Sequence, residues 1–124
     1  MKKLLLLLSV ILLTSCSESK VEELVSYEID GAWYWAIQLK EGATKDDAIE
    51  YVNMWANPNQ TSFFYVFDNN LDLSFFKNDK FTPNEFKYNI LVNKPKYGFY
   101  KMMPADDKLY DDGVWLLEQA LKKP

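Results

Sequence analysis

The sequence of 124 residues contains no histidine and no arginine, and its only cysteine is Cys16. The lack of histidine removes the Ser-His and Cys-His nucleophile pairs and the usual acid or base of catalysis near neutral pH. All 14 basic residues are lysines, so the bidentate arginine contacts typical of phosphate and nucleic-acid recognition are missing. A lone cysteine forms no disulfide within its own chain. We therefore expect no nucleic-acid partner, no disulfide and no histidine-dependent catalysis.

The first sixteen residues have the parts of a secretory signal. Lys2 and Lys3 form a basic start, and an apolar run follows from Leu4 to Leu13. This run is about half as long as the roughly 20 residues that a membrane-spanning helix needs. It ends in Leu13-Thr14-Ser15-Cys16, which resembles the lipobox of bacterial lipoproteins: an aliphatic residue, two small residues and a cysteine.

The resemblance implies a lipid anchor. The Cys16 thiol would carry a diacylglyceryl group, residues 1–15 would be removed, and residues 16–23 would form the lipidated cysteine and a polar tether. Two acyl chains hold a protein firmly in a bilayer, so the membrane is the expected partner through this anchor. Ser17 in place of an aspartate resembles the sorting signal for the outer membrane. We therefore expect a lipid-anchored protein of the cell envelope, at the outer membrane of a double-membrane bacterium.

Residues 24–124 have the length of a single globular domain. Without Lys2 and Lys3, 12 basic residues face 18 acidic ones, which gives the mature chain a net charge of about −6. Such a charge does not attract anionic lipid headgroups, so the anchor alone must hold the membrane. Aromatic residues make up 16% of the chain, and their bulk suits the core of a small domain that has no disulfide.

The first half of the domain predicts two strands, a helix and a third strand. An alternating apolar and polar stretch precedes Asp30-Gly31, a typical hairpin turn, and residues 32–39 are apolar on both faces, as in an interior strand. Thr44 caps a helix that ends at Asn57-Pro58, and residues 61–67 form another interior strand. A strand, a helix and a strand in this order predict a crossover between two parallel strands.

The second half of the domain has less uniform secondary-structure signals. Residues 83–92 also alternate as in a strand, but the cap signature Thr82-Pro83-Asn84-Glu85 favours a helix there. Residues 97–103 predict a strand and Asp111-Asp112 begins a final helix, whereas residues 71–81 give no clear prediction. Together the segments predict an α+β fold: a small mixed sheet of three to four strands with two to three helices packed mainly on one face.

Four side chains match the spacing of an EF-hand calcium loop, namely Asp68, Asn70, Asp72 and Asp79. We favour a solvated turn over this metal site, because Leu73 stands where the loop needs a glycine and a strand precedes it. Ser74 and Lys77 have a spacing suited to Ser-Lys chemistry, without further support. The acidic residues between 106 and 112 are explained by loop solvation and helix capping.

Two aromatic sets are candidates for a binding surface: Trp33 and Trp35 on one strand, and Tyr97 and Tyr100 on another. The same rings also suit the core. We expect a non-catalytic binding module without a cofactor, whose partner could be another envelope protein. One alternative is a binder of a glycan or small ligand that uses an aromatic face. The other is a hydrolase that uses two carboxylates, although the sequence places no such pair across a cleft.

Overall fold

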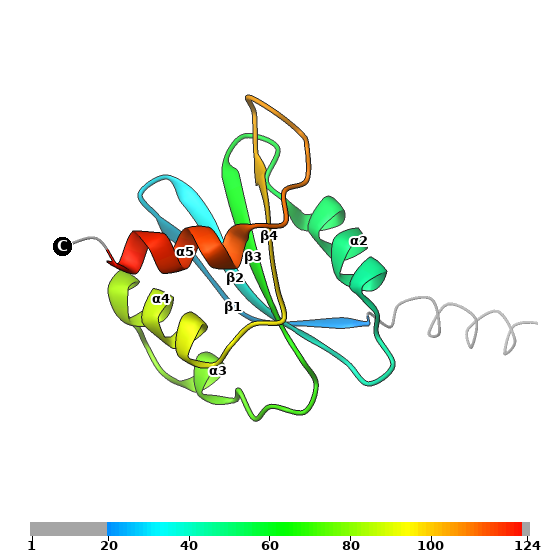
Figure 1. The fold of residues 1–124 in the computed structure, drawn as a ribbon, viewed down its shortest axis with the longest axis vertical. Coiled ribbons are helices and arrows are strands. Elements are labelled where there is room, and N and C mark those ends of the chain that lie inside the picture. Colours follow the sequence, from blue (N-terminus) through cyan, green and yellow to red (C-terminus); the bar gives the residue numbers. More distant parts are fainter. Residues whose placement is uncertain (1–19, 123–124) are drawn as a thin grey trace, which may run out of the picture.

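The computed structural model describes residues 20–122, which form a four-stranded mixed sheet and four helices (Figure 1). This architecture confirms the predicted α+β fold. In chain order the elements are β1 (Val21–Ile29), β2 (Ala32–Leu39), α2 (Lys45–Trp55), β3 (Thr61–Phe67), α3 (Phe75–Asn78), α4 (Pro83–Val92), β4 (Tyr97–Met102) and α5 (Gly113–Lys122).

The strands lie in the order β1-β2-β3-β4. Strands β1 and β2 form an antiparallel hairpin, whose turn has positive φ angles of 51° at Asp30 and 82° at Gly31, as a two-residue hairpin turn requires. Helix α2 connects β2 to β3, and these two central strands are parallel. The predicted crossover is therefore confirmed, and β4 completes the sheet antiparallel to β3.

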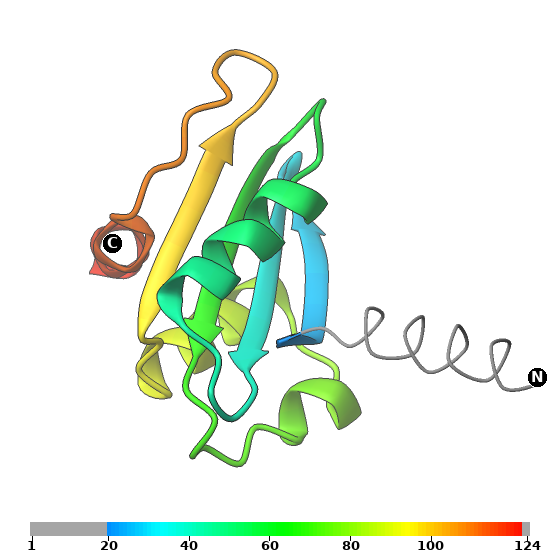
Figure 2. The same cartoon turned by 90° about the vertical axis from the view of Figure 1, so that its right-hand side faces the viewer.

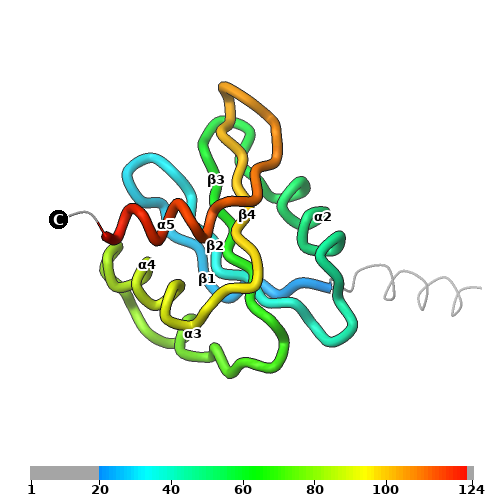
Figure 3. Tube along the Cα trace, viewed as in Figure 1, coloured from blue at the N-terminus to red at the C-terminus, as the bar shows by residue number. Residues whose placement is uncertain are grey.

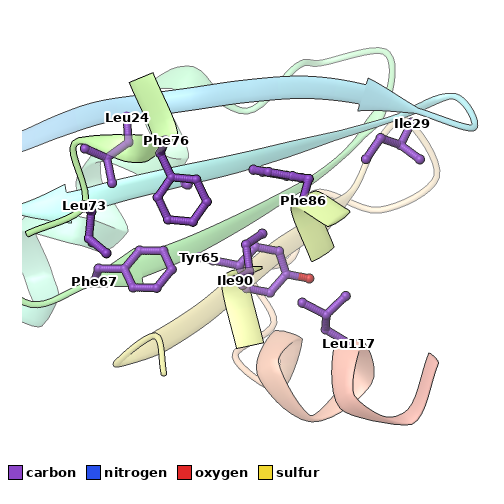
Figure 4. Close-up of a cluster of buried hydrophobic side chains, with 10 residues drawn as sticks. Leu24, Ile29, Tyr65, Phe67, Leu73, Phe76, Phe86, Ile90 and Leu117 are labelled. Carbon is purple, nitrogen blue, oxygen red and sulfur yellow. The ribbon is translucent and has the colours of Figure 1, made fainter. Parts of the chain in front are cut away.

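Helices cover both faces of the sheet unequally. Three helices, α3, α4 and α5, bury side chains such as Phe76, Phe86 and Leu117 against one face (Figure 4). Helix α2 packs alone on the other face, in front of β2 and β3 in Figure 2, and buries Ala48 and Val52 there. A helix is about 10 Å wide and strands are spaced about 4.8 Å apart, so one helix covers roughly two strands. Helix α2 therefore leaves part of this sheet face uncovered.

Helix starts follow the predicted caps. The Thr44 side chain accepts a hydrogen bond from the Asp47 backbone N–H, and the Asp47 carboxylate accepts one from the Thr44 backbone N–H. Thr82 and Glu85 form the same reciprocal capping box at α4. This local interaction explains why residues 83–92 form a helix although their apolar residues also alternate.

Strand β1 begins at Val21, so the ordered domain starts three residues before the predicted boundary at Leu24. Glu22 and Glu23 suggested a solvated tether, but an edge strand accepts charged residues, and Glu22 pairs with Lys77 of α3. Helix α3 lies within residues 71–81, the segment without a clear secondary-structure prediction.

The segment after β4 returns along the outer edge of that strand (Figure 3). Tyr100 and Tyr110 exchange two backbone hydrogen bonds, of 3.0 and 2.9 Å, and Gly98 forms a bridge to Asp112. This pairing brings the start of α5 into backbone contact with β4, because Gly98 and Gly113 lie against each other.

Candidate functional site

A pocket of about 520 Å³ lies on the α2 face of the sheet, where α2 ends beside β1 and β2. We call it the tryptophan pocket, because three of the four tryptophans of the chain line it. Its lining consists of Glu23, Ser26, Trp33, Trp35, Met54, Trp55, Ala56, Asn57 and Pro58.

The pocket exists because α2 leaves this part of the sheet uncovered. Trp33 and Trp35 are two residues apart on β2, so their side chains project from the same face. Met54 and Trp55 stand in the last turn of α2 and remain 66% and 53% exposed. The apolar surface here is therefore open to solvent, unlike the rest of the α2 face.

A hydrogen-bond network fixes the Trp33 ring. Its indole Nε1–H donates to Oε1 of Gln60 at 2.8 Å, and Asn57 Nδ2 donates to the same oxygen at 3.0 Å. The Gln60 amide nitrogen in turn donates to the Glu28 carboxylate and to the Gly31 carbonyl oxygen. Because both ends of the Gln60 amide are engaged, Trp33 is held in one orientation before any ligand arrives.

Trp35 is held by packing instead. Its ring stacks on Phe64 with a centroid separation of 5.0 Å and meets the Tyr51 ring edge-on at 6.4 Å. Its indole nitrogen is buried, yet it has no hydrogen-bond partner within residues 20–122. A buried donor without a partner costs about 1–3 kcal/mol, so Trp35 carries a polar group that an acceptor would stabilise.

The electrostatics of the tryptophan pocket are mildly acidic. Glu23 is the only charged residue in its lining, and its carboxylate accepts a hydrogen bond of 3.1 Å from the Ser26 hydroxyl. Burial and the negative charge of Glu23 together raise the pKa of the adjacent Tyr51 to about 12. No lysine lines this pocket, whereas Lys45, Lys94 and other lysines line further surface hollows.

Of the four aromatic candidates, only Trp33 and Trp35 share this site. Tyr97 lies on β4, where it stacks on Phe99 at 5.6 Å and contacts Lys45 and Lys96. Tyr100 projects from the opposite face of β4, is only 7% exposed and stacks on Tyr110 at 4.9 Å. The two tyrosines therefore do not form one platform with the tryptophans.

The other candidate residues have local structural roles. Asp68 pairs with Lys96 at 3.7 Å, and the Asp72 carboxylate accepts hydrogen bonds from the Ser74 backbone and hydroxyl. Asp79 caps the end of α3 through its backbone N–H, and Asn70 lines a surface hollow beside Asp68. Among residues 20–122, no group of three or more His, Cys, Asp or Glu side chains is arranged to hold a metal ion. The hydroxyl of Ser74 donates to Asp72 while Lys77 pairs with Glu22, so the proposed Ser-Lys pair does not form.

In the second acidic cluster, Asp106 accepts hydrogen bonds from the Tyr110 hydroxyl and from the Lys108 backbone, and these bonds lower its pKa.

The lipidation candidate Cys16 lies outside the described residues. None of the helices between residues 20 and 122 has the length and apolar character needed to cross a bilayer.

A second hollow, of about 550 Å³, lies between α4 and α5, which run side by side in Figure 1. Tyr88 and Leu121 line it and are 63% and 36% exposed, and Trp115 of α5 is 58% exposed nearby in the chain. Lysines and a glutamate also line this hollow, which makes its charge mixed.

Sequence reasoning identified Trp33 and Trp35 but missed their neighbours in the tryptophan pocket. Trp55 follows Val52 by three residues, a spacing that suits the buried face of the helix, yet it is 53% exposed. Glu23 was assigned to the tether, and nothing in the sequence links Gln60 to Trp33 across 27 residues. No protein-family model, curated protein sequence or solved structure matches this chain.

Proposed function

We propose that the protein is a lipid-anchored module of a bacterial cell envelope that works by binding, without catalysis. In this proposal the tryptophan pocket is its binding site. The pocket carries the proposal, because large exposed rings beside a few polar groups are the surfaces on which binding energy concentrates. The lipobox-like Leu13-Thr14-Ser15-Cys16 supports the anchor, and Ser17 supports an outer-membrane destination.

The fold agrees with anchoring at the N-terminal side. Lys20 adjoins the start of β1, and its carbonyl oxygen accepts a hydrogen bond from Lys40 just after β2. Trp33 lies near the start of β2, six residues and therefore about 20 Å along the strand from Leu39. A lipid attached to Cys16 would thus hold the sheet at one end and leave Trp33 toward the other end, accessible to a ligand.

The carboxylates support binding rather than hydrolysis. The acid of a glycosidase needs a raised pKa. Where the pKa of a described carboxyl group is clearly shifted, hydrogen bonds lower it. These groups are Asp47, Asp72, Glu85 and Asp106. Each serves a cap or a turn, and among residues 20–122 only Glu23 contributes a carboxylate to the tryptophan pocket.

The anchor is tested by expressing the full chain in a bacterium fed with labelled palmitate. We expect the protein to incorporate label and to partition into a detergent phase, and the Cys16→Ala variant to lose both properties. An unlabelled wild-type protein that stays in the aqueous phase would contradict the anchor.

The binding site is tested by sedimenting the purified, detergent-solubilised full chain with isolated envelope fragments. We expect Trp33→Ala and Trp55→Ala to reduce co-sedimentation. Trp115→Ala is the matched control, because Trp115 is similarly exposed but lies on α5. Equal co-sedimentation of all three variants would refute the tryptophan pocket as the binding site.

A further inference from the structure

We propose that the tryptophan pocket binds a neutral oligosaccharide of at least two sugar rings. This inference rests on the proposed function, because it names the ligand class of the same pocket. It follows from three properties of the lining: its charge, the arrangement of its rings and its hydrogen-bonding groups.

The charge of the lining excludes anionic ligands. Glu23 is the only charged residue that the described part of the chain contributes to the lining, so a phosphate, a nucleotide or an acidic sugar would be repelled without a compensating cation. Nucleic-acid bases also stack on tryptophan, but their binding depends on lysines and arginines that neutralise the backbone. The tryptophan pocket therefore suits a neutral or cationic ligand.

The arrangement of the rings favours an extended ligand over a point charge. Trp33 and Trp35 are on the same face of β2, so their attachment points are roughly 6.6 Å apart along the strand. Among the described ring pairs in contact, none joins two of the three tryptophans of the pocket. The indoles thus form a spread surface rather than a closed cage for an ammonium group, and adjacent sugar rings have flat C–H faces suited to such a surface.

The polar groups of the lining favour a ligand that donates hydrogen bonds. The Glu23 carboxylate accepts, and the Ser26 oxygen has lone pairs beyond its bond to Glu23. A sugar hydroxyl can donate to either group. A quaternary ammonium group has no N–H or O–H to donate. Gln60 adds to the fit, because it fixes the Trp33 ring without occupying the pocket lining.

The test uses the lipidated full chain in a polyoxyethylene detergent, whose headgroup is not a sugar. Titration calorimetry measures binding of maltotetraose, cellotetraose and chitotetraose, and of tetramethylammonium chloride as the cationic probe. We expect at least one tetrasaccharide to bind, and Trp33→Ala and Trp55→Ala each to weaken that binding about tenfold. Trp115→Ala should leave it unchanged. Glu23→Gln reports on the cationic alternative, because it removes the negative charge that a tetramethylammonium ion would need.

Two results would overturn the saccharide assignment: binding of none of the three tetrasaccharides, or tetrasaccharide binding that survives loss of Trp33 and Trp55. Tetramethylammonium binding that disappears in Glu23→Gln, without saccharide binding, would identify a cation site instead. Co-sedimentation with envelope fragments distinguishes failure of the saccharide assignment from failure of the proposed function. Envelope binding that depends on Trp33 and Trp55 would keep the binding site while the saccharide assignment fails. Urea unfolding of each variant confirms that the loss does not come from misfolding.

Discussion

Replacing Gly98 with alanine tests the close approach of α5 to β4. Gly98 lies on β4, where a Cβ atom would stand 2.5 Å from the backbone nitrogen of Val114 and 2.9 Å from the carbonyl carbon of Gly113. Ordinary contact begins at 3.4 Å, so α5 must move away from β4 by about 0.9 Å. Both atoms belong to the backbone, so no side-chain rotation can relieve the clash.

The expected cost combines two opposing effects. Overpacking of a well-packed site destabilises a protein by about 1–3 kcal/mol, and the backbone contact places Gly98→Ala at the upper end. Alanine is more favourable than glycine inside a regular element by roughly 0.5–1 kcal/mol, because it restricts the unfolded chain more. We therefore expect a loss of about 2 kcal/mol in the free energy of unfolding. For a domain of this size the melting temperature should fall by roughly 10 °C.

Thermal and urea unfolding followed by circular dichroism measure this loss, and Gly42→Ala is the matched control. A Cβ atom at Gly42 meets nothing within 4 Å, so alanine there suffers only from the positive φ of 82°, at a cost of about 1 kcal/mol. Gly113→Ala should resemble Gly98→Ala, because its Cβ would lie 2.9 Å from the Gly98 backbone. A Gly98→Ala protein that is no less stable than Gly42→Ala would refute the close approach of α5 to β4.

Three further predictions concern the caps, the tyrosines and the glutamine network. Thr44→Ala and Thr82→Ala should each lower the free energy of unfolding by about 1 kcal/mol in urea. Backbone hydrogen bonds from Thr44 and Thr82 lower the pKa values of Asp47 and Glu85, so the stabilisation from these carboxylates is present at neutral pH and is lost as the pH falls below about 4. The Asp47→Asn/Glu85→Gln double variant, which has no such carboxylates, should lose less stability on acidification. Burial and a hydrogen bond with Asp112 raise the pKa of Tyr100 to about 12. The neutral Tyr100 phenol therefore stabilises the folded state fully below its unfolded pKa of about 10, and this stabilisation is lost as the pH rises towards 12. In urea unfolding at alkaline pH, Tyr100→Phe should lose less stability than the unmodified protein. Gln60→Ala should increase iodide quenching of tryptophan fluorescence, because Trp33 loses its anchor, and unchanged quenching would show that the hydrogen bond does not hold the ring.

Local signals in the sequence predicted much of the fold. The hairpin turn at Asp30-Gly31 and the capping boxes at Thr44 and Thr82 depend on contacts within about four residues, so short-range chemistry determines them. The parallel pairing of β2 with β3 follows from the single helix between them. The short helix α3 has no side-chain cap hydrogen bond, and the sequence contained no signal for it.

The tryptophan pocket depends on long-range geometry, which explains why Trp33 and Trp35 were its only lining residues named as binding candidates from the sequence. Periodicity places Trp33 and Trp35 on one face, but it does not indicate whether a helix covers them. Whether a helix covers Trp33 and Trp35 depends on where α2 crosses the sheet. The same position of α2 leaves Trp55 exposed, although the helical spacing of Trp55 suits a buried face. The separation of Tyr100 from Tyr97 could have been recognised, because residues three apart on a strand project from opposite faces.

The two edges of the sheet differ in how they are protected from pairing with another copy of the chain. The returning segment at Tyr110 occupies the outer side of β4, so within residues 20–122 only β1 has no strand beyond it. An unprotected edge strand lets copies of a chain add strand to strand into polymers. The register shift between Glu23 and Val25 interrupts the regular spacing that such growth needs, and the negative charge of the exposed Glu28 repels an identical neighbour. Copies of this domain should therefore resist strand-to-strand growth through β1 even at high concentration.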